Sequence, residues 1–203
     1  ALKSAKVLGF SDKYIAKLWG VSELEVYNLR HSNGIVPIFK MVDTLHTGKY
    51  IAYLYSSYTG SNESRLTDKK KLVVLGAGPI RIGQGVEFDY STVHAVQTIK
   101  RSGYEAIIIN NNPETVSTDY DTADRLYFEP LCKEDVLNII EIEKPIGVVV
   151  AFGGQTAIKL TKCLDDAGIK ILGTSAKGID LAEDRSKFDN LLESFDIKRP
   201  KGM

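Results

Sequence analysis

The chain has 203 residues, 43% of them hydrophobic and 26% charged, a composition that suits one large globular domain or one medium domain with a small neighbour. Basic and acidic residues both number 26, so the net charge is zero, which disfavours a nucleic-acid-binding protein. No apolar run reaches the roughly 18 residues of a membrane span, and no secretory signal is visible.

The first 58 residues or so are predicted to form helices. Ser11 is positioned to cap one helix, and Ser22 with Glu25 three residues later forms a capping box for the next. The stretch from Tyr14 to Arg30 resembles a helix-turn-helix, the motif of many DNA-binding proteins. Its charges balance, however, whereas a DNA-binding surface is basic, so a helical hairpin packed into a larger helical domain is the favoured interpretation.

An aromatic-rich segment and a polar linker follow. Tyrosines between Phe39 and Tyr58 indicate either an interdomain or subunit contact, or simple core packing, and both interpretations stay open. The stretch from Thr59 to Lys71 is polar and ends in a run of lysines, which predicts a solvated linker.

From Lys71 onward, predicted strands alternate with predicted helices. The strands are expected at residues 72–75, 106–109, 126–128, 148–150 and 170–172, and the helices at 92–101, 134–143 and 157–167, with Ser175 and Asp184 capping two more. This alternation predicts an α/β fold with a parallel, doubly wound sheet and right-handed crossovers, preceded by a small all-helical domain.

Three polar loops follow predicted strands, at Gly76–Phe88, Asn110–Arg125 and Ala151–Thr156. Ligands of open parallel sheets bind beyond the carboxyl ends of the strands, so we expect the three loops to share one crevice. The first begins with Gly76 and Gly78, but Arg81 stands where a dinucleotide-binding fingerprint needs its third glycine, and no Walker lysine follows.

Several residues of these loops are candidates for chemistry. Arg81 is expected either to clamp an anion or to pair with Asp89, and Glu87 either to line a polar passage or to pair with Arg81. Glu114 is the carboxylate singled out in the second loop. The third loop opens a helix whose N–H groups could meet an anion or a neighbouring domain, or merely be capped, and its residues are Gly153, Gly154, Gln155 and Thr156.

No metal site is predicted. The three histidines fall in different elements, and Cys132 and Cys163 lack metal-like spacing. Both thiols are expected to be small packing groups in a reducing, cytoplasmic setting. The chain starts without Met and stops just after a predicted helix, from which we expect a fragment of a longer protein.

Three stretches carry a resemblance to a known family: GAGPIRIGQGVEFDYSTVHA, NNNPETVSTDYDTADRLYFEP and FGGQT. In this order and spacing they strongly resemble the carbamoyl-phosphate synthase large subunit, over essentially all of residues 71–200. The phrase NPETVSTDYD resembles the carboxy-terminal half, which phosphorylates carbamate. The helical segment, with FKMVDT and the tyrosines near Tyr55, looks like the end of the family's oligomerisation domain, which removes the DNA-binding hypothesis.

The resemblance implies an ATP-dependent ligase of arginine and pyrimidine biosynthesis. The intact subunit would take ammonia from a small glutaminase subunit, activate bicarbonate with one ATP, phosphorylate the resulting carbamate with a second, and pass intermediates through an internal tunnel. ATP with Mg²⁺ or Mn²⁺ is thus implied for the intact subunit, and no cofactor for this piece. Implied partners are the glutaminase subunit, the rest of the large subunit and further copies through the helical domain, with no nucleic acid or membrane.

The resemblance also implies the domain borders and the roles of single residues. Residues 1–66 would end the oligomerisation domain, 71–185 would form a Rossmann-like pre-ATP-grasp domain, and 186–203 would start a truncated ATP-grasp domain. Four residues match positions lining the carbamate passage, while no catalytic residue is implied here: Arg81, Gly85, Glu87 and Glu114. The isolated piece is expected to be folded but inactive. The alternative is a non-catalytic Rossmann-like module for binding or association.

Overall fold

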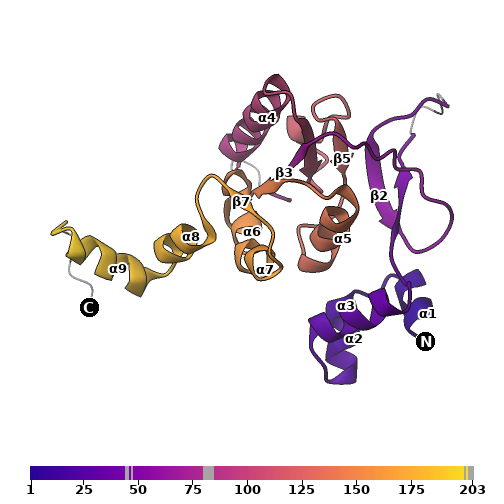
Figure 1. The fold of residues 1–203 in the computed structure, drawn as a ribbon, viewed down its shortest axis with the longest axis horizontal. Helices are drawn as coiled ribbons and strands as arrows, with labels where there is room; N and C mark the ends of the chain where they lie inside the picture. Colours follow the sequence, from indigo (N-terminus) through magenta and orange to yellow (C-terminus); the bar gives the residue numbers. More distant parts are fainter. Residues whose placement is uncertain (44–45, 47, 80–84, 199, 201–203) are drawn as a thin grey trace.

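The computed structural model describes residues 1–43, 46, 48–79, 85–198 and 200. The chain starts with three short helices, which we call the helical unit: α1 (Leu2–Val7), α2 (Asp12–Trp19) and α3 (Glu23–Ser32). The predicted caps are confirmed, because Ser11 accepts a hydrogen bond from the N–H of Tyr14, and Ser22 and Glu25 form the reciprocal capping box. The three helices lie together near the N-terminus (Figure 1), and a small apolar core holds them together.

The prediction that helices continue to residue 58 is wrong. Residues 38–57 contain two antiparallel strands, β1 (Ile38–Met41) and β2 (Tyr53–Ser57), with Phe39 opposite Ser56. Phe39 and Leu54 are buried while their strand neighbours are more exposed, so the segment has the period-2 pattern of a sheet edge and not the 3.6-residue pattern of a helix.

One sheet joins this segment to the rest of the chain. Its strand order is β1-β2-β5-β4-β3-β6-β7, and every pair is parallel except β1 with β2. The predicted α/β class with a parallel, doubly wound sheet is therefore confirmed. The remaining strands are β3 (Lys71–Leu75), β4 (Glu105–Ile109), β5 (Arg125–Tyr127), β6 (Gly147–Val149) and β7 (Ile171–Leu172).

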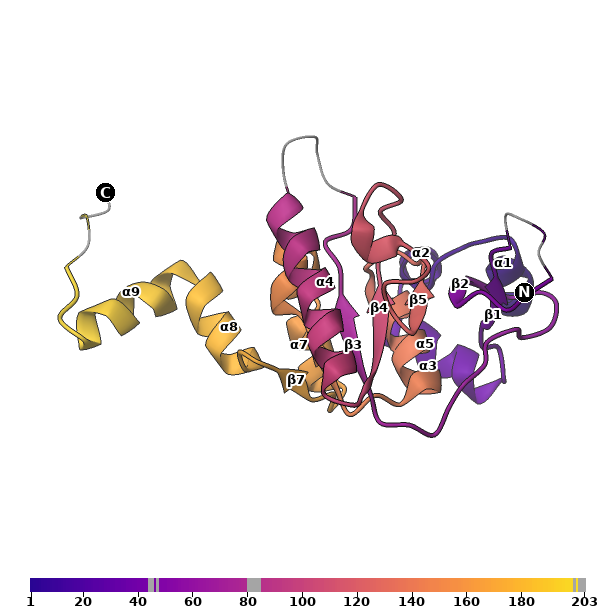
Figure 2. The same cartoon turned by 90° about the horizontal axis from the view of Figure 1, so that it is seen from above.

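Helices cover both faces of the sheet (Figures 1 and 2). One face packs against α4 through Val96 and Ile99, and the other packs against α5, α6 and α7. The helix predicted over 157–167 is divided in two, and α8 and α9 extend away from the sheet, with no buried residue in α9. The helices are α4 (Val86–Arg101), α5 (Lys133–Glu143), α6 (Gly154–Ile158), α7 (Thr161–Asp166), α8 (Ala176–Glu183) and α9 (Arg185–Ser194), with 3-10 turns η1 (Val116–Thr118) and η2 (Ala151–Gly153).

Buried charges fasten the helical unit to α5. Lys6 and Arg30 contact the carboxylate of Asp12 at 3.0 and 2.9 Å, and Lys6 also pairs with Glu134 of α5 at 2.5 Å. The hydroxyl of Tyr58, just after β2, donates to the same Glu134. Since a buried charge is tolerated only when it is paired, these contacts, which we call the ionic joint, specify one arrangement of the helical unit on the sheet.

The residues that connect β2 to β3 do more than link two elements. The side-chain oxygen of Asn62 accepts a hydrogen bond from the N–H of Phe39, and the carboxylate of Glu63 accepts one from the N–H of Met41. These contacts occupy the outer edge of β1, where unpaired backbone groups could otherwise form hydrogen bonds with a strand of another chain. Within the described residues, no helix is both long and apolar enough to cross a membrane.

Candidate site at the carboxyl edge of the sheet

The three polar loops meet where β3, β4 and β6 end. A Cβ atom on Gly76 would lie 2.4 Å from the side chain of Asn110, which follows β4. A Cβ atom on Gly153, after β6, would lie 2.4 Å from the carbonyl oxygen of Gly76. Only glycine therefore fits at either position, and the reason is close approach between loops.

Two asparagines hold the glycine loop in place. The backbone N–H of Gly78 donates to Oδ1 of Asn110 at 2.9 Å, and Nδ2 of Asn112 donates to the carbonyl oxygen of Gly78 at 3.3 Å. The side-chain oxygen Oδ1 of Asn112 accepts a hydrogen bond from the backbone N–H of Glu114 at 3.0 Å. The N–H of Gly78 is thus committed to a neutral amide oxygen and is not available to bind a phosphate group.

Helix α4 starts at the same edge. Its N-cap is Gly85, with a φ of 84°, and its first turn carries the carboxylates of Glu87 and Asp89. Acidic side chains stabilise a helix N-terminus, but they also repel an incoming phosphate. The described residues at this edge, which do not include 80–84, therefore do not suit the triphosphate of ATP, and we assign no ATP contact to them.

Asp89 connects α4 to the second loop. Its two carboxylate oxygens accept the backbone N–H groups of Val116 and Ser117, at 3.1 and 3.0 Å. The alternative that Asp89 pairs with Arg81 lies outside the described residues, as does everything predicted for Arg81 itself. Sequence reasoning missed the contact of Asp89 with the second loop. The only sequence signal for it was that Asp89 is a carboxylate in a polar segment.

The third loop packs against α4 and α8. Gly154 has a φ of 57°, and a Cβ atom on Gly154 would lie 3.0 Å from the ring of Phe88. The amide of Gln155 donates to the carboxylate of Glu183 in α8 at 2.8 Å. Thr156 is exposed, and its methyl carbon lies 3.5 Å from the place that a Cβ atom on Gly78 would occupy. Side chains of this loop thus contact α4 and α8, and the role predicted for its N–H groups, toward an anion, a neighbouring domain or a cap alone, stays a prediction.

Residues 68–181, more than half of the chain, match the family model of the carbamoyl phosphate synthase preATP-grasp domain. The chain belongs to the carbamoyl-phosphate synthase large-chain family. Residues 1–34 match a second model, the carbamoyl-phosphate synthetase large chain oligomerisation domain, which covers the helical unit. The strands β1 and β2 lie in the segment between the two matches.

Solved structures similar to this carbamoyl-phosphate synthase chain include two carboxylases and a synthetase. The biotin carboxylase subunit of pyruvate carboxylase is 21% identical (TM-score 0.43), with 62% of this chain and 27% of that chain covered. N5-carboxyaminoimidazole ribonucleotide synthetase from Thermus thermophilus is 15% identical (TM-score 0.45), with 64% and 31% covered. The biotin carboxylase domain of a single-chain bacterial carboxylase is 13% identical (TM-score 0.44), with 63% and 29% covered. The chain thus spans less than a third of each.

The predicted passage residues that the structure describes lie on two connected elements. Glu87 is on the first turn of α4 and Glu114 is in the second loop, and both are exposed, whereas Gly85 is buried. The bridge between the two elements is Asp89. Within the described ranges, no three His, Cys, Asp or Glu residues are grouped as ligands for a metal ion.

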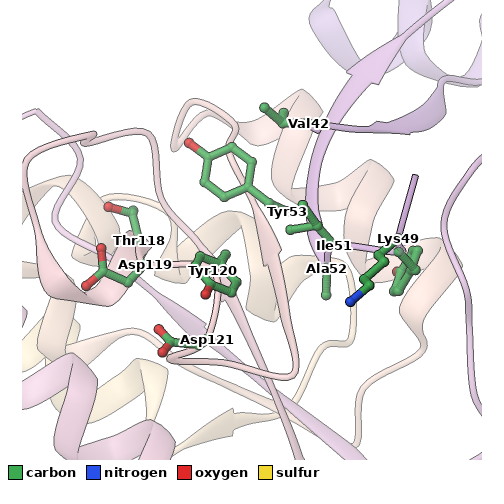
Figure 3. Close-up of a pocket in the computed structure, with 10 residues that line it drawn as sticks. Val42, Lys49, Ile51, Ala52, Tyr53, Thr118, Asp119, Tyr120 and Asp121 are labelled. Carbon is green, nitrogen blue, oxygen red and sulfur yellow. The ribbon is translucent and has the colours of Figure 1, made fainter. Parts of the chain in front are cut away.

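A separate apolar cavity of about 720 Å³ lies next to the second loop (Figure 3). Tyr53 and the residues that precede it form one wall, and the segment 118–121 forms the other. The Tyr53 ring also stacks on Phe128, with 5.5 Å between ring centroids. The tyrosine-rich segment therefore contributes both to packing in the sheet and to a cavity wall.

Sequence reasoning also missed an unusual carboxylate at the end of β5. Glu129 is 6% exposed and accepts the backbone N–H of Ser56. Burial raises the pKa of Glu129 to about 7, and burial also raises the pKa of the nearby Asp135 to about 6. The thiol of Cys132 donates to Asp135; desolvation of the sulfur by the surrounding protein and the negative charge of Asp135 raise the pKa of Cys132 to about 12, so Cys132 is not a reactive thiolate.

Proposed function

We propose that this chain is part of a carbamoyl-phosphate synthase large subunit that makes carbamoyl phosphate from bicarbonate, glutamine-derived ammonia and two ATP. The observation that carries the proposal is the order of the two family matches on one chain, oligomerisation domain and then pre-ATP-grasp domain. ATP with Mg²⁺ or Mn²⁺ would activate bicarbonate and then carbamate at sites formed by the rest of the intact subunit, and the acidic first turn of α4 at this edge supports that placement.

The role of this piece is to wall the passage through which carbamate reaches its phosphorylation site. Glu87 and Glu114 present carboxylates from two elements that Asp89 holds together. Carboxylates accept hydrogen bonds from N–H and O–H groups, so they can guide neutral species such as ammonia or carbamic acid, the protonated form of carbamate, while the surrounding protein excludes bulk water. Arg81 and Gly85 belong to the same proposed lining.

The proposal extends to domain organisation and partners. Residues 1–66 would end an oligomerisation domain, residues 71–185 would form the pre-ATP-grasp domain, and residues 186–203 would begin the ATP-grasp domain. Exposed apolar side chains on α2, on α3 and in the turn between them support self-association through the helical unit: Leu18, Trp19, Val21 and Leu24. A small glutaminase subunit would supply ammonia, in the cytoplasm, for arginine or pyrimidine synthesis, and the 203-residue piece alone would be inactive.

The test is the variant Glu114→Ala in the full-length large subunit with its glutaminase partner. Carbamoyl-phosphate synthesis is measured beside two partial reactions, bicarbonate-dependent ATP hydrolysis and ATP formation from carbamoyl phosphate. We expect both partial reactions to survive and overall synthesis to collapse, because the intermediate is lost between the two sites. Asp121→Ala, another exposed carboxylate of the same loop, is the matched control and should leave all three rates unchanged.

Other outcomes would contradict parts of the proposal. Loss of ATP formation from carbamoyl phosphate would place Glu114 in the second active site and not in the passage. Unchanged rates would show that Glu114 has only a structural role in the loop. If the unmodified complex makes no carbamoyl phosphate at all, the proposed function itself is wrong.

A further inference from the structure

The second loop is anchored to α4 through an unusual cap. The 3-10 turn η1 begins with the N–H groups of Val116 and Ser117, which have no partner within the turn and need an acceptor. Thr115 occupies the N-cap position, where a side chain of its own type normally supplies that acceptor. The Thr115 side chain makes no cap hydrogen bond, and its hydroxyl instead lies within hydrogen-bond distance of Thr118 and Ser117.

Asp89 supplies the missing acceptor from a different element. One oxygen accepts the N–H of Val116 at 3.1 Å and the other accepts the N–H of Ser117 at 3.0 Å, across 27 and 28 residues of sequence. Hydrogen bonds from backbone N–H groups to a carboxylate are charge-assisted and stronger than neutral ones. A local cap by Thr115 would satisfy only one of these N–H groups, that of Ser117, and would not connect the loop to α4.

The position of this cap relates it to the two passage carboxylates. Glu87 is two residues before Asp89 on α4, and Glu114 is two residues before Val116 in the loop. The side chains of Glu87 and Glu114 are exposed, and among the described contacts neither is held by a side-chain hydrogen bond of its own to another element. The cap therefore sets how far apart α4 and the loop hold the two carboxylates.

We propose that Asp89 is a positioning residue that fixes the separation of Glu87 and Glu114, and thereby keeps the two ATP-consuming steps coupled. This inference rests on the proposed function. Asp89 is assigned no contact with a reacting atom, and its two oxygens accept the backbone N–H groups of Val116 and Ser117. It acts through the loop, and the quantity it controls is the fraction of intermediate that reaches the second site.

The test uses the full-length large subunit with its glutaminase partner and the variant Asp89→Ala. The readout is the ATP hydrolysed per carbamoyl phosphate formed. We expect both partial reactions to persist while overall synthesis falls at least about tenfold and the ATP ratio rises accordingly, since the variant loses two charge-assisted hydrogen bonds and one alone corresponds to about a factor of ten in an equilibrium. Asp89→Asn keeps one acceptor oxygen and should restore part of the coupling.

Asp124→Ala is the matched control. Its carboxylate also accepts a backbone N–H, that of Ala106 at 2.8 Å, from the far end of the same loop. It should destabilise the protein comparably without changing the ATP ratio. Amide hydrogen exchange at Val116 and Ser117 should accelerate in Asp89→Ala and stay slow in Asp124→Ala, which identifies the local cause.

A double variant with Glu114→Ala separates this inference from the proposed function. If Asp89 acts through Glu114, adding Asp89→Ala to Glu114→Ala causes no further loss of coupling. A multiplicative loss would overturn the inference, as would an Asp89→Ala protein with an unchanged ATP ratio or with all three rates lowered equally. In these cases uncoupling by Glu114→Ala alone would still support the proposed function. An unmodified complex that makes no carbamoyl phosphate would overturn both.

Discussion

At the scale of single residues, burial changes the chemistry of Glu129 more than sequence can indicate. It lies just after β5 and is 6% exposed. Burial raises its pKa from 4.5 to about 7, and the hydrogen bond from the N–H of Ser56 only partly opposes this. Asp135 and Glu134 add negative charge nearby, which also raises the pKa. The carboxyl group is therefore protonated over a range in which an exposed glutamate is ionised.

The stability of the protein should consequently depend on Glu129 between pH 4.5 and 7. In this window the native state retains a proton that the unfolded chain releases, so the free energy of unfolding falls as pH rises. The stabilisation by protonated Glu129 is full below pH 4.5 and lost above 7. Glu129→Gln keeps an acceptor for Ser56 but cannot titrate, so its stability relative to the unmodified protein should increase across this window by about 3 kcal/mol.

Urea unfolding at a series of pH values measures this difference. Glu63→Gln is the matched control, because Glu63 also accepts a strand N–H, that of Met41, but is exposed. The control should follow the unmodified protein throughout. Parallel pH curves for Glu129→Gln and the unmodified protein would show that the carboxyl group of Glu129 is ionised at ordinary pH.

At the scale of elements, buried charges hold the amino ends of three strands together. Lys71 begins β3, Glu105 begins β4 and Arg125 begins β5, and Glu143 of α5 is 1% exposed beneath them. Glu143 pairs with Lys71 at 3.1 Å and with Arg125 at 2.7 Å, and it accepts the hydroxyl of Tyr127. This cluster lies at the opposite end of the sheet from the candidate site, so it stabilises the fold and takes no part in the proposed passage.

Glu143→Gln should therefore destabilise the fold strongly. The variant keeps the size of the side chain but leaves Lys71 and Arg125 buried with one carboxylate, that of Glu105, and losing one partner of a buried pair costs about 3–5 kcal/mol. Urea unfolding measures the loss. Glu141→Gln is the control on the same helix, since its carboxylate is 52% exposed and should contribute less than about 1 kcal/mol. Equal losses for the two variants would contradict this account.

At the scale of the whole molecule, the ionic joint makes the helical unit and the sheet depend on each other. Lys6, Asp12 and Arg30 are each 3% exposed or less, and Arg30 also donates to Asn138 of α5 at 3.1 Å. Separating the two parts would expose these pairs and the apolar surface around them together. The small apolar core of the helical unit, centred on Ile15, Ala16 and Val26, has little capacity to hold that unit alone.

We expect the two parts to unfold in one transition. Trp19 is the only tryptophan and lies in α2, so its fluorescence follows the helical unit, whereas far-UV circular dichroism follows the whole chain. The two signals should have coincident urea midpoints. Asp12→Ala should shift the Trp19 transition to lower urea and separate the signals, while the exposed neighbour Lys13→Ala should not. Separate midpoints in the unmodified protein would contradict the coupling.

The local features of this protein were determined by its sequence alone. Ser11 and the Ser22–Glu25 pair cap the helices as predicted, and the apolar runs of residues 72–75 and 106–109 form the central strands. Caps, turns and apolar runs depend on residues a few positions apart, so their physics is visible in a short window. For the same reason the three loops could be assigned to the carboxyl ends of strands. The motifs that these loops carry were also sufficient to recognise the family.

The contacts that arrange the candidate site were decided by the tertiary structure. The strand β2 pairs with β5 some 70 residues later, and Asp89 caps Val116 and Ser117 across 27 and 28 residues. The sequence around the tyrosine-rich segment does not indicate which strand pairs with it. An aspartate in the first turn of a helix is equally consistent with stabilising that helix. Such pairings become favourable only when the sheet brings distant segments together, because strand edges and backbone N–H groups accept many partners and the fold selects one.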